Sequence, residues 1–445
     1  MTMLDQAVEQ KQAPYLSAFA RLEAKLAGIG PRWLHDTRRV AIDSFAELGF
    51  PATRNEEWKF TNVAAIAGIP FPLASRGGDL AVAEELIRDL PGGGNRLVFV
   101  NGYYAPELSR QLERRAIIGN LREALEEGKP ELDRHLCRYA GYRTHPFIAL
   151  NTAFLVDGAL VHVPAGTFVE SPIHLVHIST GGPSPQASYP RNLIVLEEGA
   201  QASVIETYIG RGASVHEHPY LTNVVTEIVG GQESVLDHYR LQMESDGGFH
   251  IATVQMAQGR GCAFRSHSLT FGAALARTEV NAVLSEGSDC TLNGLYVAGG
   301  NQHVDSRTSI DHAQPHGTSH ELYKGILDGR SSAVFNGKII VRKDAQKTDA
   351  KQTNKNLVLS EDSTINTKPE LQILADDVRC THGATIGQID NDALFYLQSR
   401  GVGQEQAREM LIAAFAGEII EGIRVEPLRG YVESTLAVRL ARNAK

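Results

Sequence analysis

The feature that most constrains this chain is a series of short apolar runs through its middle. From about residue 146 to residue 385, runs of four to seven apolar residues are interrupted every eight to twelve residues by Gly, Asn or Asp. Clear examples are 192–196, 203–208, 234–241, 335–341 and 370–374. Runs of this length between turn residues predict β-strands. The spacing leaves no room for helices between them, which excludes a sheet of strand–helix–strand units.

A loose internal repeat favours one arrangement of these strands. A glycine followed five residues later by an apolar residue recurs at intervals of 31, 29, 28 and 42 residues. The apolar members are Val204, Val235, Phe264, Leu292 and Val334. Repeats in this range are typical of stacked coils, in which each coil covers the apolar edges of its neighbour. We therefore predict a β-solenoid with these side chains inside it, and an antiparallel β-sandwich is the alternative.

Helices are predicted before this region. In the first 30 positions, apolar residues recur at the period of an amphipathic helix: Tyr15, Phe19, Leu22 and Leu26. The other elements expected before residue 140 are helices over 32–48 and 121–137 and a strand over 96–104.

The tail is also predicted to be helical. Asp390 can cap a helix that begins near residue 391, and Gly401 can adopt the left-handed conformation that ends it. Two more helices are expected over 404–422 and 425–444. The first carries an apolar stripe that should be covered: Ala407, Met410, Leu411, Ala414, Phe415 and Ile419. The predicted domains are a mostly helical 1–140, a β core over 141–388 and a helical 389–445.

Charge and composition exclude several partners and locations. The chain has 43 Lys and Arg against 52 Asp and Glu, a formal net charge of -9. This balance argues against a general binder of nucleic acid or anionic membranes. No stretch approaches the roughly 20 apolar residues that span a bilayer, and the start MTMLDQAVEQKQ lacks the order of a secretory signal. The four cysteines form no Cys-x-x-Cys pair, so a reducing, cytoplasmic setting is expected.

The glycine-rich segments do not predict a nucleotide site. A phosphate-binding loop follows a strand and opens a helix, whereas 92–94 precedes a predicted strand. Gly337-Lys338 is followed by Ile339 inside a strand instead of by Ser or Thr. We expect this chain itself to bind no nucleotide.

Histidines cluster between residues 303 and 320. His312, His316 and His320 have the four-residue spacing of metal ligands on one helix face. Pro315 and Gly317 interrupt any such helix, so histidines in turns and coils are the favoured interpretation. The pairs His174/His177 and His216/His218 are interpreted as structural in the same way.

Cys380 and His382 form a different kind of pair. In a strand, residues i and i+2 lie on one face, so the thiol and the imidazole would project together. These are ligands suited to zinc or to iron–sulfur species. A lone Cys-x-His pair is also common as ordinary structure, and two ligands cannot close a four-coordinate site. The remainder would have to come from elsewhere in the chain or from a partner.

The segment 336–401 closely resembles the SufB/SufD family, the scaffold proteins of the Suf iron–sulfur cluster assembly system. The resemblance is carried by KTDA (347–350), QTNKNLVLS (352–360), TKPELQI (367–373), CTHGAT (380–385) and FYLQSRG (395–401), with a weaker match at EEWKFT (56–61). Within the family the chain is most similar to the SufD type. SufB-like chains carry a His-Glu pair where this chain has Thr381-His382-Gly383.

The resemblance implies a fold and a complex. The implied fold is a right-handed parallel β-helix flanked by helical domains. The implied complex pairs this chain with a SufB-like scaffold, and each scaffold carries a SufC-like ATPase on its C-terminal helices. A transient iron–sulfur cluster would be shared at the scaffold interface, with His382 facing a SufB cysteine and Cys380 beside it. The resemblance implies a non-enzymatic scaffold and leaves open both flavin binding and a homodimer formed without SufB.

A carbohydrate-active β-helix enzyme, a polysaccharide lyase or hydrolase, is the alternative from another functional class. Such chemistry needs acidic residues that converge with a Lys or Arg in a groove. The available residues are Asp305, Arg307, Asp311 and Lys324, and nothing in the sequence groups them.

Overall fold

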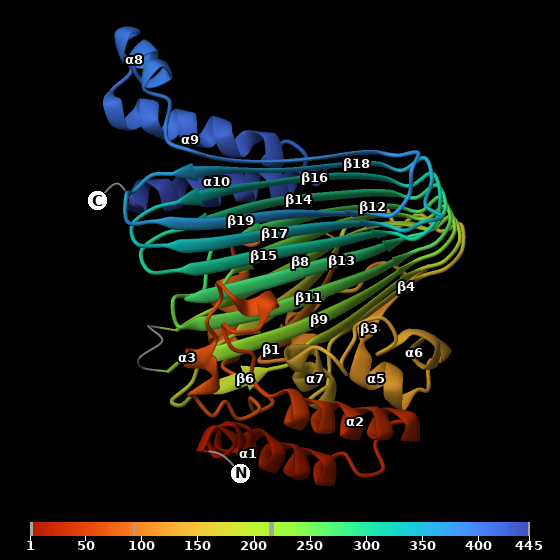
Figure 1. Ribbon diagram of the computed structural model, residues 1–445. Coiled ribbons are helices and arrows are strands. Elements are labelled where there is room, and N and C mark those ends of the chain that lie inside the picture. Colours follow the sequence, from red (N-terminus) through yellow and green to blue (C-terminus); the bar gives the residue numbers. More distant parts are fainter. Residues whose placement is uncertain (1–2, 93, 213–217, 444–445) are drawn as a thin grey trace.

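The centre of the computed structural model is a solenoid whose coils consist of parallel β-strands (Figure 1). The structure describes residues 3–92, 94–212 and 218–443. In this part of the chain, successive strands of the solenoid alternate between two 10-stranded sheets, which we call the first and second walls. Within the walls, strands pair in parallel with the strands one coil before and one coil after them, and the first pair of each wall is antiparallel. The predicted parallel β-solenoid is confirmed.

The two walls run almost the full length of the core. The first wall contains, in spatial order, β2 (Tyr103–Tyr104), β1 (Asn95–Val100), β5 (Ile173–Ser179), β8 (Gln201–Gly210), β10 (Val235–Met243), β12 (Ala263–Thr270), β14 (Asp289–Ala298), β16 (Thr318–Leu327), β18 (Asp349–Val358) and β20 (Arg379–Gly387). The second contains β3 (Ile117–Asn120), β4 (Ala159–Val163), β7 (Arg191–Leu196), β9 (Tyr220–Gly230), β11 (Gly248–Gln258), β13 (Leu275–Leu284), β15 (His303–His312), β17 (Ser332–Val341) and β19 (Thr364–Ile373), with β6 (Gln186–Ser188) beside β9.

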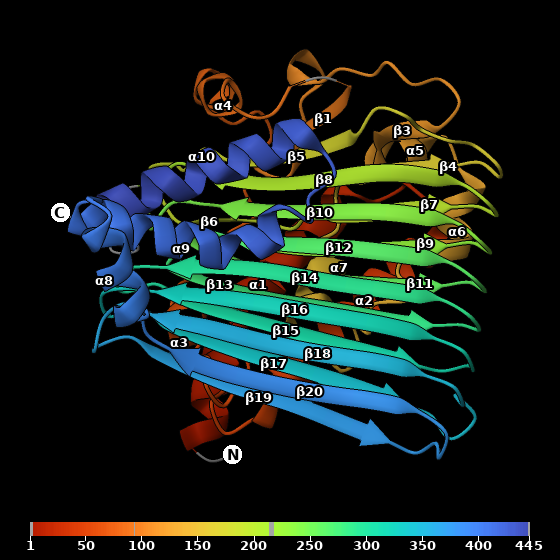
Figure 2. The same cartoon turned by 90° about the horizontal axis from the view of Figure 1, so that it is seen from above.

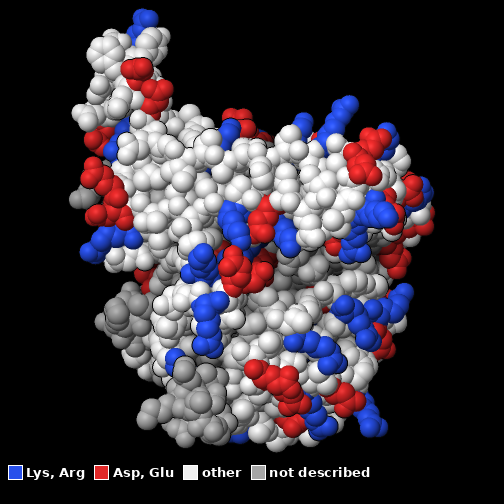
Figure 3. Space-filling view, viewed as in Figure 1, with Lys and Arg blue, Asp and Glu red and all other residues white. Residues whose placement is uncertain are grey.

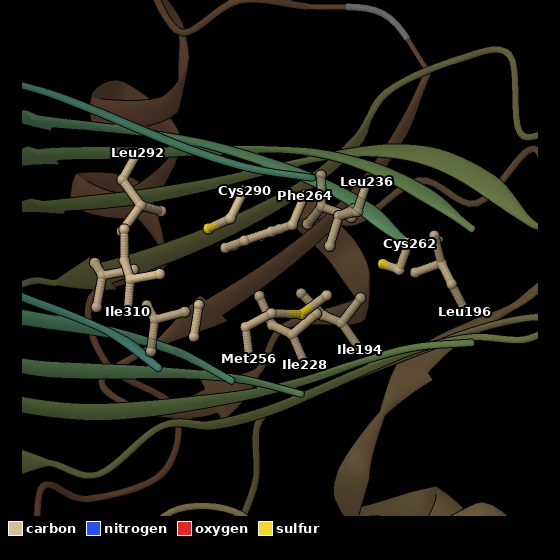
Figure 4. Packing of buried hydrophobic residues seen from close by; sticks show 14 of the residues in the cluster. Ile194, Leu196, Ile228, Leu236, Met256, Cys262, Phe264, Cys290, Leu292 and Ile310 are labelled. Carbon is tan, nitrogen blue, oxygen red and sulfur yellow. The ribbon is translucent and has the colours of Figure 1, made fainter. Parts of the chain in front are cut away.

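Apolar side chains from both walls meet inside the solenoid. Because side chains alternate between the two faces of a strand, every second residue points inward. Figure 4 shows part of this interior, where Leu236, Phe264 and Leu292 of the first wall face Ile228 and Met256 of the second. Of the five predicted interior residues, Val204, Phe264 and Leu292 belong to this cluster.

The other two predicted interior residues are on the wrong face. Val235 is half-buried at the start of β10, and its neighbour Leu236 occupies the interior. Val334 is buried, but its neighbours Ala333 and Phe335 are the interior residues of β17. The distance from the glycine to the first residue of the strand differs between coils, and a shift of one residue exchanges the two faces.

Helices cover the outer face of the second wall at its first coils. α1 (Met3–Lys25), α2 (Arg32–Leu48) and α7 (Pro146–Ala153) pack on outward residues of this wall, including Leu221 and Phe249. Tyr15, Phe19 and Leu22 are buried there, which confirms the predicted α1 face. The smaller elements are η1 (Glu56–Trp58), α3 (Ala64–Ala67), α4 (Leu80–Ile87) and η2 (Pro106–Leu108).

The helix predicted over 121–137 is instead two short helices. These are α5 (Leu121–Glu126) and α6 (Pro130–His135). Gly128, just after α5, has a φ of 68°, which is not a helical conformation. Pro130 has no backbone N–H to continue the hydrogen bonds of α5, and it begins α6 instead. The strand predicted over 96–104 is instead two strands, β1 and β2, which pair antiparallel across a turn at Asn101 and Gly102, where φ is 52° and 86°.

The segment around η1 reaches coils that are distant in sequence. The guanidinium of Arg277 lies 3.6 Å from the centroid of the Trp58 ring. Thr61 Oγ1 donates to Asp305 Oδ2 at 2.6 Å, and Glu56 pairs with Lys368 at 2.8 Å across 312 residues of sequence. Charged side chains of both signs lie over the middle of this face (Figure 3). The N-terminal segment therefore fastens several coils together from outside.

Three helices form the tail. α8 (Asn391–Ser399) is capped by Asp390 Oδ1, which accepts the N–H of Asp392, and Gly401 has a φ of 86°, so both predicted helix boundaries are confirmed. α9 (Gln404–Ile420) and α10 (Glu426–Asn443) lie across the outer face of the first wall (Figure 2). Among the described residues, no helix combines the length and the apolar character needed to cross a bilayer.

The apolar stripe predicted on α9 is only partly correct. Ala407 and Ile419 are buried, whereas Met410 is 46% exposed and Ala414 is also exposed. The helix packs instead through a face that includes Ile412 and Ala416, because the first wall supplies the surface it covers. The apolar pattern of the helix alone does not predict which of its faces packs against the first wall.

Candidate functional site

The last coil of the solenoid carries the Cys380–His382 pair. Both residues lie on β20, which has one neighbouring strand, β18, and ends the first wall. Cys380 packs against the interior cluster, so its side chain points inward. His382 is two residues further along and points to the same side. The strand predicted for this pair is confirmed, and the pair lies at an open end of the solenoid.

The exposure of the pair differs between its two members. Cys380 is half-buried, whereas every other residue of β20, His382 included, is exposed. Burial, followed by the nearby Asp349 carboxylate, raises the pKa of the Cys380 thiol. This thiol is therefore protonated at neutral pH and would lose its proton on binding a metal. The imidazole of His382 makes no hydrogen bond within the described part of the chain.

Buried polar atoms without partners gather next to this pair. Within the residues that the structure describes, Asp349 Oδ1, Gln352 Oε1 and Thr367 Oγ1 are shielded from solvent and have no hydrogen-bond partner. Asp349 and Gln352 lie on β18, beside β20, and Thr367 lies on β19, the end strand of the second wall. Such atoms are usually satisfied, and others occur elsewhere in the described chain, but these three lie at the open end, where a bound molecule could supply the missing partners.

The chain alone does not assemble a complete metal site here. Across the described ranges, no three His, Cys, Asp or Glu side chains lie close enough together to hold a metal ion. A thiol and an imidazole supply two ligands, and a tetrahedral site needs four. What the open end can do is contribute ligands to a site completed by another molecule.

The structure separates the other candidate histidines. His312 is fully buried and hydrogen-bonded to Ser319, His316 lies in a turn with a φ of 62°, and His320 is exposed. His174 and His177 are buried on β5, as interpreted from the sequence. His218 is exposed, and His216 with its neighbour Glu217 lies outside the described residues.

The residues considered for a carbohydrate-active site are also separated. Asp305 is buried between Arg277 and Arg307 on the second wall, and Asp311 pairs with Arg342. Lys324 lies on the first wall and pairs with Glu418 of α9. The structure gathers no acid–base pair in a groove from this set.

A second surface feature lies on the tail. A groove of about 530 Å³ runs between α9 and α10, and its walls are mostly apolar. It includes Met410, Ala413, Ile420, Leu436 and Leu440. α8 projects beyond the solenoid (Figure 1) and exposes 72% of Phe395. These apolar surfaces are open in the chain described here.

Sequence reasoning missed the buried amides behind the Cys380–His382 pair. Gln352, Asn354 and Asn356 alternate along β18, and all three are buried. Three amides at every second position of a strand share one face, and an amide face toward a core predicts a hydrogen-bonded ladder. That signal was present in the segment QTNKNL.

Comparisons with known proteins agree with this architecture. The family model "SUF system FeS cluster assembly, SufBD core domain" matches residues 177–415, and "SufBD protein N-terminal region" matches 9–175. An iron–sulfur cluster assembly SufBD family protein of Synechocystis is 37% identical over 98% of each chain. The SufD protein of Escherichia coli is 31% identical over 91% of this chain and 92% of its own. The SufD protein of Bacillus subtilis is 24% identical over 95% and 96%. The chain thus belongs to the SufBD family of SUF-system iron–sulfur cluster assembly proteins.

Proposed function

We propose that this chain is a SufD-type scaffold subunit that shares a nascent iron–sulfur cluster with a SufB-like partner at the open end of its solenoid. The observation that carries the proposal is the incomplete ligand pair, Cys380 and His382, on a terminal coil. The cluster is the cargo of this site. His382 would supply a nitrogen ligand, Cys380 would stand beside it, and thiolates of the partner would complete the coordination.

The open end also suits a partner of the same fold. β19 and β20 each have a neighbouring strand on one side only, so one edge of each strand offers free backbone hydrogen-bonding groups. Interior residues such as Ile365 and Leu371 are only partly buried at this end. A second solenoid stacked on the open end would cover both the free strand edges and these partly buried side chains. In the absence of a SufB-like chain, a second copy of this chain would occupy the same edges as a homodimer.

A SufC-like ATPase would dock on the tail. The groove between α9 and α10 and the exposed Phe395 offer apolar surface on elements that are anchored to the first wall. Movement of a docked ATPase would be transmitted through these helices to the solenoid. In this assembly the chain acts as a scaffold and the ATPase supplies the energy.

The proposed setting is the cytoplasm. All four cysteines are unpaired, as expected for a reducing compartment. A thiol near a nascent cluster needs the same conditions, since oxidation would remove it as a ligand.

The ligand role is tested by co-expressing the full chain with SufB-like and SufC-like partners and measuring the mass, iron and sulfide of the purified complex. His382→Ala should leave assembly intact, because it removes an exposed side chain, and should greatly reduce cluster formation. Cys380→Ala should reduce it less. The matched control is His316→Ala, an exposed turn histidine away from the open end. A His382→Ala complex that builds clusters at the wild-type rate would refute the ligand role.

A further inference from the structure

Gln352 lies directly behind His382 in the solenoid. The two residues are register partners on β18 and β20, and Glu321 of β16 is the partner of Gln352 one coil further in. Register partners of parallel strands point to the same side, so the three side chains form one interior column. Glu321 and Gln352 are buried, at 3% and 1% exposure, and His382 is at the exposed end.

The hydrogen bonds of this column orient the Gln352 amide. Gln352 Nε2 donates to Glu321 Oε2 at 2.8 Å, and Glu321 Oε1 accepts from Thr308 Oγ1 at 2.5 Å. The amide oxygen and nitrogen point in different directions from Cδ, so the bond of Nε2 toward β16 leaves Oε1 facing away from Glu321. Gly337 lies across the interior, where a Cβ would approach Gln352 Nε2 to 2.2 Å, so a larger residue there would displace this amide.

The oxygen of this amide has no partner. Gln352 Oε1 is buried and makes no hydrogen bond to any residue that the structure describes. A buried acceptor without a donor is destabilising, so such an atom calls for a group that joins it. Another amide of β18 shows that β20 is within reach: Asn356 Nδ2 donates to the backbone oxygen of Thr385 at 3.3 Å. The ring N–H of His382 is the donor next in the column.

We propose that Gln352 is the positioning residue of His382: the exposed imidazole, which makes no hydrogen bond in the conformation described, turns so that Gln352 Oε1 accepts its ring N–H. The proposal rests on the ligand role of His382 proposed above and adds the group that prepares that ligand. A histidine ligand usually donates its second ring N–H to an acceptor, which fixes the tautomer and the ring orientation. With one ring nitrogen held inside the solenoid, the lone pair of the other points out of the open end, toward the partner. Gln352 itself does not contact the cluster.

The first test measures the tautomer of His382 in the full chain without partners or cluster. ¹⁵N-histidine-labelled protein at pH 8 gives two-bond ¹⁵N–¹H correlations, and the His382 signals are identified by their loss in His382→Ala. The wild-type ring should show one tautomer. Gln352→Met, which keeps the side-chain length and removes the acceptor, should show a mixture. Ser319→Ala is the control, because it also removes a buried interior hydrogen bond, that to His312, but lies outside this column.

A second variant keeps the column and exchanges its members. In the double variant Glu321→Gln/Gln352→Glu, the amide of residue 321 can donate to the carboxylate of residue 352, which still presents an oxygen toward His382. This variant should restore the single tautomer. In the complex with the SufB-like and SufC-like partners, Gln352→Met should slow cluster formation about 10-fold, as for other groups that orient metal ligands, and the exchanged variant should recover most of the rate.

The outcomes separate this proposal from the one on which it rests. A single tautomer and a wild-type rate in Gln352→Met would overturn the positioning role even if His382→Ala abolishes cluster formation. A mixture of tautomers in Gln352→Met would support the hydrogen bond between Gln352 and His382. Normal cluster formation by His382→Ala, observed together with it, would refute the role of His382 as a ligand. If Gln352→Met does not fold, as judged by thermal melting, Gln352→Asn replaces it, because it withdraws the amide by one methylene.

Discussion

Arg191 and Glu227 form an ion pair between adjacent strands of the second wall, and both side chains are completely buried. Arg191 Nη2 lies 2.7 Å from Glu227 Oε2. The same carboxylate accepts the backbone N–H groups of Cys137 and Tyr139 at 2.7 Å and of Ala140 at 3.0 Å. One buried carboxylate thus fastens the loop after α6 to the solenoid.

Glu227→Gln should destabilise the fold by about 3–5 kcal/mol, because it leaves the Arg191 charge buried without a counter-charge. Urea denaturation followed by circular dichroism measures the change. Asp377→Asn is the control, since Asp377 and Lys347 form an exposed pair whose removal should cost less than about 1 kcal/mol. Equal effects of the two substitutions would contradict the anchoring role of Glu227.

The register of the coils can be tested with neighbouring residues of one strand. Leu236→Ala removes an interior side chain of β10 and should destabilise by about 2–5 kcal/mol. Val235→Ala changes a half-buried side chain on the outer face and should cost clearly less. Both are measured by the same denaturation experiment. A larger effect at Val235 would support the register predicted from the glycine spacing and contradict the structure.

Glu321 makes the stability of the chain depend on pH. Burial outweighs the hydrogen bonds from Thr308 and Gln352 and raises the pKa of its carboxyl group to about 7, above roughly 4.3 for an exposed Glu. Between these values the native state retains a proton that the unfolded chain has released, so the contribution of Glu321 to stability falls as pH rises. Glu321→Gln removes this dependence. Its free energy of unfolding, relative to wild type, should therefore increase from about pH 4 to pH 7 and level off above pH 7. A difference that does not change with pH would contradict the raised pKa.

Point substitutions in the groove of the tail should separate docking from folding. Met410→Glu and Ala413→Glu place a charge in the groove between α9 and α10 and should reduce capture of a SufC-like ATPase by at least about 10-fold, since a desolvated charge in an apolar contact costs more than about 1.4 kcal/mol. Thermal melting should change little, because Met410 and Ala413 are exposed. Co-purification of the ATPase with the full chain measures the effect, and undiminished capture by both variants would refute docking in this groove.

Deletion of 390–445 is a poorer test of ATPase docking than these point substitutions. α9 and α10 cover apolar residues on the outer face of the first wall, among them Leu269, Leu295 and Ile326. Removing the tail would expose them to solvent. We expect the truncated chain to be destabilised or to aggregate, which thermal melting and light scattering would show, so loss of ATPase binding by that chain would not identify the groove.

The sequence predicts the elements of this fold better than their contacts. Turn residues between short apolar runs identify the strands, and the cap at Asp390 and the stop at Gly401 identify the boundaries of α8, because these signals are local. The interior face of β10 and the buried face of α9 are different in kind. The interior face of β10, which excludes Val235, depends on the position of the neighbouring coils. The buried face of α9, which excludes Met410, depends on the position of the first wall. The spacing of apolar residues within the strand or helix does not specify either position.

The site follows the same division. The alternation of a strand is sufficient to predict that Cys380 and His382 share a side. Their place at the open end depends on β20 being the last strand of its wall. The column of Glu321, Gln352 and His382 depends on the register of three strands separated by about one coil each, which a single sequence does not specify. Contacts between residues that are far apart in sequence could therefore not be predicted from the sequence alone.

The contact between Glu56 and Lys368 has a consequence for how the chain is made. At roughly 5–20 residues per second of synthesis, a separation of 312 residues means that Lys368 leaves the ribosome roughly 15–60 s after Glu56. Trp58 and Thr61 wait a shorter time, until Arg277 and Asp305 have been made, although Trp58 also packs on the earlier Phe147. Until Arg277 is made, the face of the Trp58 ring that its guanidinium covers is open, so a chaperone that binds exposed aromatic segments can act during translation, before the final coils exist.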